Sequence, residues 1–266
     1  MISAANLTLL YGQLPLEQRF SAARADGFRN VEILFPYDQS PQWYADRLHE
    51  NELNLVLVNT PTEAGTAQWG RAAIPGQERA FRQDFSRVAE LCEVTACKAV
   101  HVMVGCLPPE AHSAGREVLL SNLEWAAGQV PDLVLQLEAL NSEDVPGYFY
   151  SKPSIVRSIL QEAKLASAGM QFDFYHVLRE GLELEAELEA SLPWVRHVQV
   201  AGTPERNEPD LERDTGFLAG FRRLHEAGYL GCVGFEYRPA DSISEGLRWA
   251  AALKPYFSQL PTAAFR

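Results

Sequence analysis

Four oxygen-bearing side chains, Glu138, Asp173, Gln199 and Glu236, each lie in or directly after a short apolar run of the sequence. Successive members are separated by 35, 26 and 37 residues, and each interval is about the length of one strand–helix unit. If each run is a strand of one parallel sheet, the four side chains meet at the carboxyl end of that sheet. The spacing therefore predicts one site that is built by four consecutive strands.

The residue types at these positions are typical of two kinds of site. Carboxylates in apolar surroundings need a compensating charge or hydrogen bonds. An Mg²⁺ or Mn²⁺ site with four oxygen ligands would supply that charge, and so would a buried network with Arg and Lys. For any one of these carboxylates, helix capping or a surface ion pair is a third interpretation.

Other polar residues of the predicted strands could face the same site. His176 stands three residues after Asp173, and Asn6, Glu32 and His101 lie in or beside apolar runs. The sequence contains no Gly-x-Gly-x-x-Gly, P-loop, His-Glu-x-x-His or Gly-x-Ser-x-Gly motif. Nucleotide-dependent and serine-hydrolase functions therefore lose their main support.

The elements that must position these residues are about eight strand–helix units. Residues 1–266 are predicted to form a single-domain (β/α)8 TIM barrel, and an open doubly wound sheet is the alternative. Gly27, Gly169 and Gly228 are expected to end helices. The predicted helices include Leu16–Asp26, Gln77–Cys92 and Thr215–Ala227. The predicted strands are Ala4–Leu10, Asn30–Leu34, Leu53–Asn59, Ala99–Val104, Leu133–Leu137, Met170–Phe174, Val195–Val200 and Cys232–Glu236.

One long connection, Thr60–Gly76, follows the third predicted strand and has little periodicity. Long loops of compact domains are usually functional or disordered. At the carboxyl end of a barrel this loop could close over a substrate, and the alternative is a surface loop without a role.

The composition restricts the partners and the compartment. The chain has 266 residues, 47% hydrophobic residues and a formal net charge of −12, which disfavours a nucleic-acid partner. The four cysteines form no CxxC pair, and neither a basic leader nor an apolar run of membrane-spanning length is present. We therefore expect a cytoplasmic protein with a small-molecule partner and no membrane association.

At these motifs the sequence resembles the hydroxypyruvate isomerase family, within the xylose isomerase-like TIM barrels that also include ketose 3-epimerases and an apurinic endonuclease family. The resemblance covers most of the chain. The segments that carry it are Ala4–Gly12, Gly27–Glu32, Phe35–Asp38, Arg71–Gly76, Leu137–Asn141, Val145–Tyr148, Phe172–His176, His197–Gln199 and Gly234–Pro239.

The resemblance implies an isomerase that converts hydroxypyruvate to tartronate semialdehyde. It implies metal ligation by Glu138, Asp173, Gln199 and Glu236, proton transfer by Glu138 and Glu236, and a substrate contact by His176. A divalent ion, Mg²⁺ or Mn²⁺, would stabilise the negative charge that develops as a proton leaves the carbon beside the carbonyl. The carboxylate of the sugar-acid substrate needs an anchor, for which we expect Arg71, with Asn6 and His101 as secondary candidates. Related barrels often pair, so a homodimer is also expected.

Several residues depart from the family pattern near the expected substrate face. Cys106 stands where a lysine is typical, Ala139 where a proline is typical, and Ser142 where a histidine is typical. The segment Glu208–Arg213 also differs from the family pattern. The departures leave room for other substrates, namely a 2-oxo-tetronate or a free ketose handled by an isomerase or 3-epimerase. Two rival functions are those of an endonuclease and of a barrel that binds sugar acids without catalysis.

Overall fold

Eight parallel strands close into a barrel in this computed structural model, which describes residues 1–62, 68–214 and 216–265. Each strand pairs with the next, and β1 pairs with β8 in the register Ile2↔Cys232 to Ala5↔Phe235. This pairing confirms the (β/α)8 barrel and excludes the open sheet. The strands are β1 (Ile2–Asn6), β2 (Asn30–Ile33), β3 (Asn54–Asn59), β4 (Ala99–His101), β5 (Val134–Leu137), β6 (Ala168–Asp173), β7 (Val195–Val200) and β8 (Cys232–Phe235).

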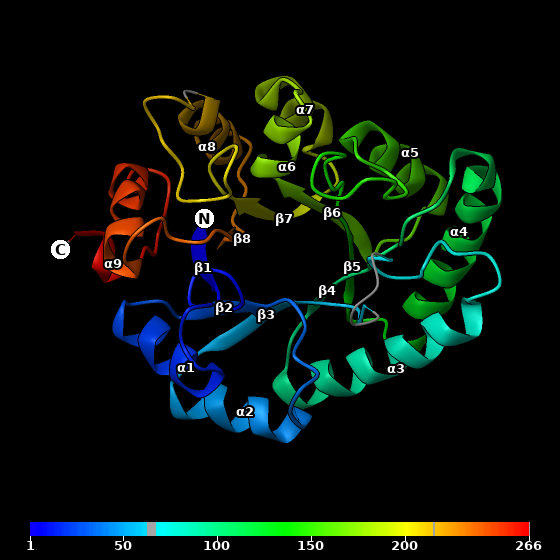
Figure 1. Cartoon of the computed structure of the whole chain (residues 1–266), viewed down its shortest axis with the longest axis horizontal. Coiled ribbons are helices and arrows are strands. Elements are labelled where there is room, and N and C mark those ends of the chain that lie inside the picture. The colour runs from blue at the N-terminus through cyan, green and yellow to red at the C-terminus, as the bar shows by residue number, and fades with distance from the viewer. Residues whose placement is uncertain (63–67, 215, 266) are drawn as a thin grey trace.

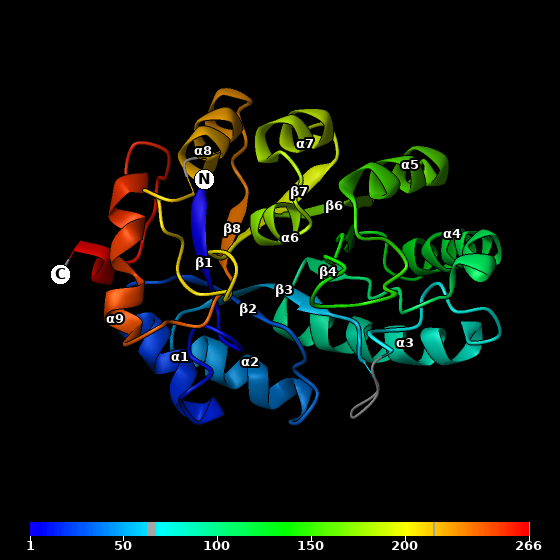
Figure 2. The ribbon, with the colours of Figure 1, turned by 45° about the horizontal axis from the view of Figure 1, so that its top comes forward.

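Helices surround the strands as an outer ring, which is seen end-on in Figure 1 and tilted in Figure 2. None of the helices in the described part of the chain is long and apolar enough to cross a membrane. The α-helices are α1 (Leu16–Ala25), α2 (Pro41–Glu50), α3 (Glu78–Thr95), α4 (His112–Gln129), α5 (Pro153–Ala163), α6 (Phe174–Arg179), α7 (Leu184–Ser191), α8 (Gly216–Glu226) and α9 (Ile243–Gly246). Three short 3₁₀ segments are η1 (Pro109–Ala111), η2 (Arg248–Leu253) and η3 (Thr262–Phe265).

The barrel buries two different kinds of side chain. Between strands and helices lies an apolar layer that contains large aromatic residues such as Phe85 and Phe221. The interior instead holds polar side chains, which include Glu32 and His197, in contact across the barrel. Because side chains alternate between the two faces of a strand, each strand can serve both layers. The polar interior is therefore built into the strands themselves.

Three expectations about element ends are wrong, and one of them concerns the fourth strand, which ends at His101 and not at Val104. The first strand ends at Asn6, not Leu10, because the Asn6 side-chain oxygen accepts hydrogen bonds from the backbone N–H groups of Thr8 and Leu9, both at 3.1 Å. These bonds turn the chain out of the sheet. Gly169 lies inside β6 and does not end a helix.

The other expected helix ends are confirmed. Gly27 and Gly228 take left-handed φ angles of 98° and 74°, two residues after the ends of α1 and α8. At the end of α5, Lys164 with φ 51° takes the left-handed role that the sequence predicts for Gly169. A non-glycine residue in this conformation gives a weaker sequence signal.

The connection between β3 and α3 is fastened to the chain that follows β4. Part of the predicted long loop, residues 63–67, lies outside the described residues. Beyond it, the backbone N–H groups of Arg71 and Ala72 donate to the carbonyl oxygen of Met103 at 3.1 and 3.2 Å. Gly70 has a φ of 101°, and a Cβ atom there would overlap Met103. Gly70 therefore permits the close approach that places Trp69.

We expect Gly70→Ala to lower the free energy of unfolding by at least about 2 kcal/mol more than Gly76→Ala, measured by urea denaturation. Both glycines have positive φ angles, but a Cβ atom at Gly76 has no neighbour within 4 Å. The Gly76 variant thus controls for backbone strain alone. Equal losses in the two variants would contradict the steric argument.

Candidate active site

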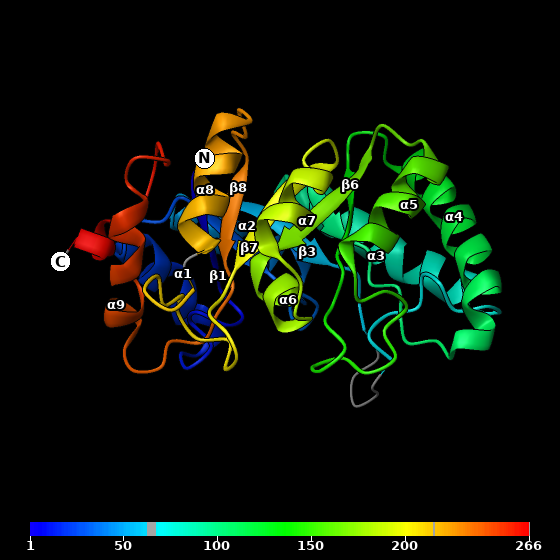
Figure 3. The ribbon, with the colours of Figure 1, turned by 90° about the horizontal axis from the view of Figure 1, so that it is seen from above.

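The four predicted oxygen ligands converge at one end of the barrel. Glu138 follows β5, Asp173 ends β6, Gln199 lies in β7 and Glu236 follows β8. Asp173 pairs in register with Gln199, and Gln199 with Gly234. The connections that follow β5, β7 and β8 gather at this end, the lower edge in Figure 3. The closed parallel sheet thus brings together side chains that are far apart in sequence.

All four residues are buried, with at most 4% of any of them exposed. One oxygen of each carboxylate, Glu138 Oε1, Asp173 Oδ2 and Glu236 Oε2, accepts no hydrogen bond from the described residues. Glu138, Asp173 and His176 also place ligand atoms within 4.8 Å of one another. Buried carboxylate oxygens rarely stay without partners. These oxygens without hydrogen bonds fit a hard divalent cation.

One guanidinium, Arg206 in the loop after β7, faces these carboxylates. Its Nη2 atom lies 3.2 Å from Glu236 Oε1 and 3.5 Å from Asp173 Oδ2. The guanidinium also stacks on Tyr175, with its carbon 4.9 Å from the ring centre. The charge of Arg206 alone cannot balance three ionised carboxylates. The metal site and the buried arginine network predicted from the sequence therefore both apply in part. Arg206 pairs with two of the carboxylates, and the negative charge that remains can be balanced by a cation.

The electrostatics of the site follow from this imbalance. Burial, followed by the charge of Glu236, raises the pKa of Glu138 well above its ordinary value. Burial also raises the pKa of Glu236 to about 8 and that of Asp173 to about 6, although Arg206 opposes both shifts. Carboxyl groups with raised pKa values are suited to general acid–base chemistry near neutral pH.

His176 is held in one neutral tautomer. Its Nδ1 atom accepts a hydrogen bond from the backbone N–H of Asn141 at 3.0 Å, and the Asn141 side-chain nitrogen lies 2.7 Å away. Burial, followed by the charge of Arg206, lowers the pKa of His176 well below its ordinary value. A neutral imidazole that accepts at Nδ1 carries its proton on Nε2. This nitrogen, 3.8 Å from Glu138 Oε1, can donate to a substrate but cannot also ligate a metal.

Behind the carboxylates lies a chain of amide contacts. Gln171 Nε2 donates to Glu138 Oε2 at 2.7 Å and to Gln199 Oε1 at 2.5 Å. Gln199 Nε2 donates in turn to Glu32 Oε2 at 2.9 Å. His101 Nδ1 lies 3.1 Å from Glu138 Oε2, and burial lowers the pKa of this histidine to about 3. The amide chain links the predicted ligands to the barrel interior.

A cavity of about 280 Å³ opens directly onto this site. Its volume suits a substrate of a few carbon atoms. Its polar lining consists of Thr8, Asn59, His101, Glu138, Asp144, His176, Arg206, Glu236 and Arg238. Its apolar lining consists of Leu9, Leu34, Phe35, Trp69, Met103, Leu140 and Val145.

The structure does not bring every predicted substrate residue into this cavity. Arg71 is not among the residues that line it, and Arg71 Nε lies 3.0 Å from Asp84 Oδ2 on α3. Asn6 is fully buried below it and donates to Glu32 at 3.2 Å. His101 and His176 do line the cavity.

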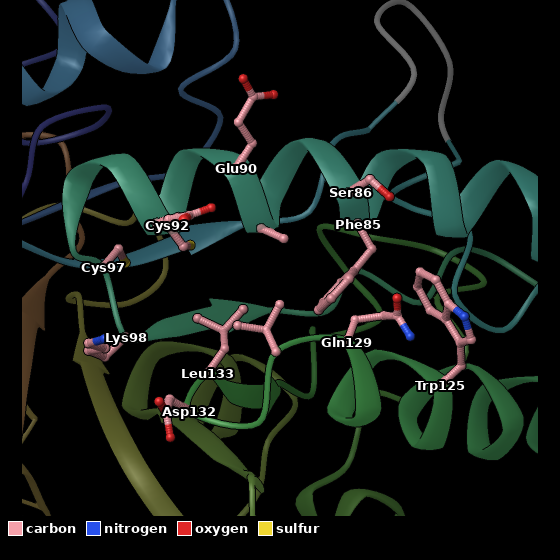
Figure 4. Close-up of a pocket in the computed structure, with 13 residues that line it drawn as sticks. Phe85, Ser86, Glu90, Cys92, Cys97, Lys98, Trp125, Gln129, Asp132 and Leu133 are labelled. Carbon is pink, nitrogen blue, oxygen red and sulfur yellow. The ribbon is translucent and has the colours of Figure 1, made fainter.

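A larger hollow of about 530 Å³ lies between α3 and α4 (Figure 4). Phe85 and Trp125 line it on the helix side. Lys98 and Leu133 line it immediately before β4 and β5, which places it at the amino ends of these strands. Active sites of such barrels lie at the opposite end. Size therefore does not identify the site here.

The departures from the family pattern lie outside the cavity wall. Neither Cys106, Ala139 nor Ser142 lines the cavity. The Ser142 hydroxyl donates to Glu180 at 2.8 Å, away from the carboxylates. Glu208 accepts a hydrogen bond from the backbone N–H of Ala240 at 3.0 Å. The expected alteration of the pocket is therefore not found at these residues.

Sequence reasoning missed the two arginines that do line the cavity, Arg206 and Arg238. Both lie in loops that follow strands, where barrel enzymes carry their functional residues. The backbone N–H of Arg238 donates to the carbonyl oxygen of Arg206 at 2.9 Å, which joins the two loops. The position of Arg238, two residues after Glu236, is the signal that could have found it.

Comparison with known proteins agrees with this fold. The family model described as xylose isomerase-like TIM barrel matches residues 20–253. A 2-oxo-tetronate isomerase of Cupriavidus necator is 37% identical, over 96% of this chain and 98% of its own. A putative hydroxypyruvate isomerase of Mus musculus is 35% identical, over 92% of each chain. The crystal structure of a family 2 AP endonuclease from Brucella melitensis superimposes with a TM-score of 0.89 at 31% identity, covering 97% of this chain and 100% of that one.

We expect the metal-free protein to lose stability as pH rises from about 5 to about 8. The pKa of Glu236 is raised from 4.5 to about 8 in the folded state, so ionisation in this window favours the unfolded chain. In Glu236→Gln the fall in melting temperature over this range should be smaller by about 4 °C or more. Thermal unfolding in EDTA measures it, with the exposed Glu117→Gln as matched control. A fall that Glu236→Gln leaves unchanged would contradict the assignment.

Proposed function

Because the chain belongs to the xylose isomerase-like TIM barrel family, we propose that it is an aldose–ketose isomerase of the hydroxypyruvate isomerase type. Its reaction interconverts hydroxypyruvate and tartronate semialdehyde. One observation carries the proposal: Glu138 and Glu236, two buried carboxyl groups with raised pKa values, face one small cavity from different strands. A proton shuttle between neighbouring carbons needs such a pair.

A divalent ion, Mg²⁺ or Mn²⁺, fits the donor set of the site. Glu138, Asp173, Gln199 and Glu236 would hold it through oxygen atoms, which hard cations prefer. When bound, the ion stabilises negative charge on the carbonyl oxygen of the substrate. His176 is left out of this ligand set, because its Nε2 atom carries a proton.

The two glutamates then move the proton. One of them, as carboxylate, takes a proton from C3 of hydroxypyruvate, and the other, as carboxylic acid, delivers a proton to C2. The C3 hydroxyl proton is lost and the C2 oxygen gains one, so the aldehyde and the new alcohol form without net oxidation. In the metal-free protein, burial raises the pKa values of both glutamates, which is the direction that a general acid needs.

Two further residues orient the substrate. Nε2–H of His176 donates to a substrate oxygen, because Asn141 occupies the other ring nitrogen. Arg206 stands beside Glu236 and Asp173, and its stacking on Tyr175 limits its movement. A guanidinium at this place favours negative charge on the reacting oxygens.

The carboxylate of the sugar acid binds Arg238 in our proposal. Arg238 lines the cavity and is exposed at its mouth, whereas Arg71, the anchor expected from the sequence, is paired with Asp84. An arginine fork matches the two oxygens of a carboxylate.

A four-carbon 2-oxo-tetronate is the second candidate substrate. The relative from Cupriavidus necator bears that name, and a cavity of about 280 Å³ has room for one more hydroxymethylene group. The same glutamates and arginines would serve it. A free ketose lacks the carboxylate that Arg238 would bind, which makes an epimerase reaction the weaker alternative.

A nuclease is a rival function, because the similar structure from Brucella melitensis is named an AP endonuclease. A DNA-binding protein needs positive charge to neutralise phosphates, and this chain has a formal net charge of −12. A sugar-acid-binding barrel would have no use for a pair of proton-transferring glutamates.

A cytoplasmic location and a homodimer stay predictions from the sequence.

Solvent-deuterium incorporation tests the proposed reaction. NMR should show metal-dependent exchange into hydroxypyruvate for the wild type, and a loss of at least about 100-fold in Glu138→Gln and Glu236→Gln. The same assay with 2-oxo-tetronates and free ketoses ranks the substrates. Wild-type protein that binds metal but exchanges no substrate would sink the isomerase proposal and favour a binding protein.

The two candidate anchors can be distinguished by kinetics. We expect Arg238→Ala to raise KM for hydroxypyruvate by about 10-fold or more, because a charge-assisted contact to the carboxylate is lost. Arg71→Ala should leave KM unchanged, since Arg71 does not line the cavity. The reverse pattern would restore Arg71 as the anchor.

A further inference from the structure

We propose that Glu32 is a positioning residue that fixes the orientation of the Gln199 side-chain amide, so that its carbonyl oxygen and not its NH₂ group faces the carboxylate cluster. The inference rests on the proposed function in one respect, that the cluster holds a divalent cation. It adds a residue from β2 to a site whose ligands all come from the second half of the chain.

Glu32 is fully buried and has hydrogen-bond partners on two other strands, β1 and β7. Gln199 Nε2 lies 2.9 Å and Asn6 Nδ2 lies 3.2 Å from Glu32 Oε2, and His197 Nε2 contacts Glu32 Oε1. A Cβ atom at Gly234 on β8 would overlap the Glu32 carboxylate. The barrel therefore makes room for this group at β8 and holds it from β1 and β7.

The hydrogen-bonding chemistry of Glu32 decides which end of Gln199 it can contact. A carboxylate only accepts hydrogen bonds, so the NH₂ end of the Gln199 amide must face it. The carbonyl oxygen then points to the opposite side, where it lies 2.5 Å from Gln171 Nε2. That same nitrogen lies 2.7 Å from Glu138 Oε2, so the Gln199 oxygen stands beside the carboxylate cluster.

Without Glu32 the Gln199 amide would lose the contact that holds its NH₂ end, and only the hydrogen bond from Gln171 to its oxygen would oppose its turning over. The two ends of a side-chain amide have nearly the same shape, and three carboxylates attract an NH₂ donor. A turned amide would offer hydrogen atoms to the cation site in place of an oxygen ligand. The neighbouring Asn6 cannot replace Glu32 as the acceptor for the Gln199 NH₂ group, because the Asn6 side-chain oxygen already accepts hydrogen bonds from the backbone N–H groups of Thr8 and Leu9. Partners that orient metal ligands typically change metal affinity by 10- to 100-fold.

Mn²⁺ affinity, measured by calorimetry without substrate, tests the proposal on the full chain. We expect Glu32→Gln to weaken Mn²⁺ binding by about 10- to 100-fold, because the new amide can donate to the Gln199 oxygen and allow it to turn. In a Gln199→Ala background, Glu32→Gln should add less than about 3-fold, because the residue through which it acts is gone.

A double variant supplies the decisive comparison. A carboxylate presents oxygen whichever way it is turned, so Glu32→Gln combined with Gln199→Glu should bind Mn²⁺ within about 3-fold of the wild type. This pair keeps one carboxylate and one amide in contact, and it answers the question even if Glu32→Gln alone does not fold. Thermal unfolding in EDTA checks the fold of each variant.

Each outcome bears on the proposal. Weak binding by Glu32→Gln together with recovery in the double variant supports positioning through Gln199. Wild-type affinity in Glu32→Gln, equal losses with and without Gln199, or failure of the double variant to bind would overturn it. The deuterium-exchange assay is separate: a wild type that binds Mn²⁺ but exchanges no substrate sinks the isomerase reaction and leaves this inference standing.

Discussion

The cost of burying Glu138, Asp173 and Glu236 beside one another governs the carboxyl end of the barrel. Each group is almost inaccessible to water, and one guanidinium is placed to balance them. Isolated ionised carboxylates in such surroundings would shift toward their neutral forms, which is the direction of all three pKa shifts. The repulsion and desolvation of these carboxyl groups would destabilise an ordinary core. Here they give the site both its affinity for a cation and its acid–base groups.

Residues that contact the site from behind determine the protonation and the orientation of its side chains. Asn141 occupies one nitrogen of His176 and so determines which nitrogen carries the proton. Tyr175 backs the Arg206 guanidinium, and its backbone N–H caps one oxygen of Asp173 at 2.8 Å. Asn141, Tyr175, His176 and Asp173 are all buried. The site is thus organised before any ligand arrives, as catalysis by fixed dipoles and charges requires.

The strand-end positions could be predicted from the sequence because a parallel barrel converts a spacing of one unit into proximity. Glu138, Asp173, Gln199 and Glu236 converge for that reason alone. Arg206 could not be placed in this way, because it acts from a loop whose path depends on its contacts with Tyr175 and the end of β8. Arg71 failed as a cavity residue for the same reason, since its loop turns its side chain toward α3. The first strand was predicted to extend beyond Asn6 because the apolar run in the sequence continues through the turn that follows it.

The placement of Glu32 divides the barrel into two halves with different tasks. The half from β5 to β8 contributes the oxygen atoms, and the half from β1 to β4 contributes Glu32, Asn6 and His101 behind them. A fragment made of the second half alone would hold the ligand residues without the group that orients Gln199. Tight metal binding would then report on the reunion of the two halves across both the β4–β5 and the β1–β8 seams, which makes the site an indicator of barrel closure.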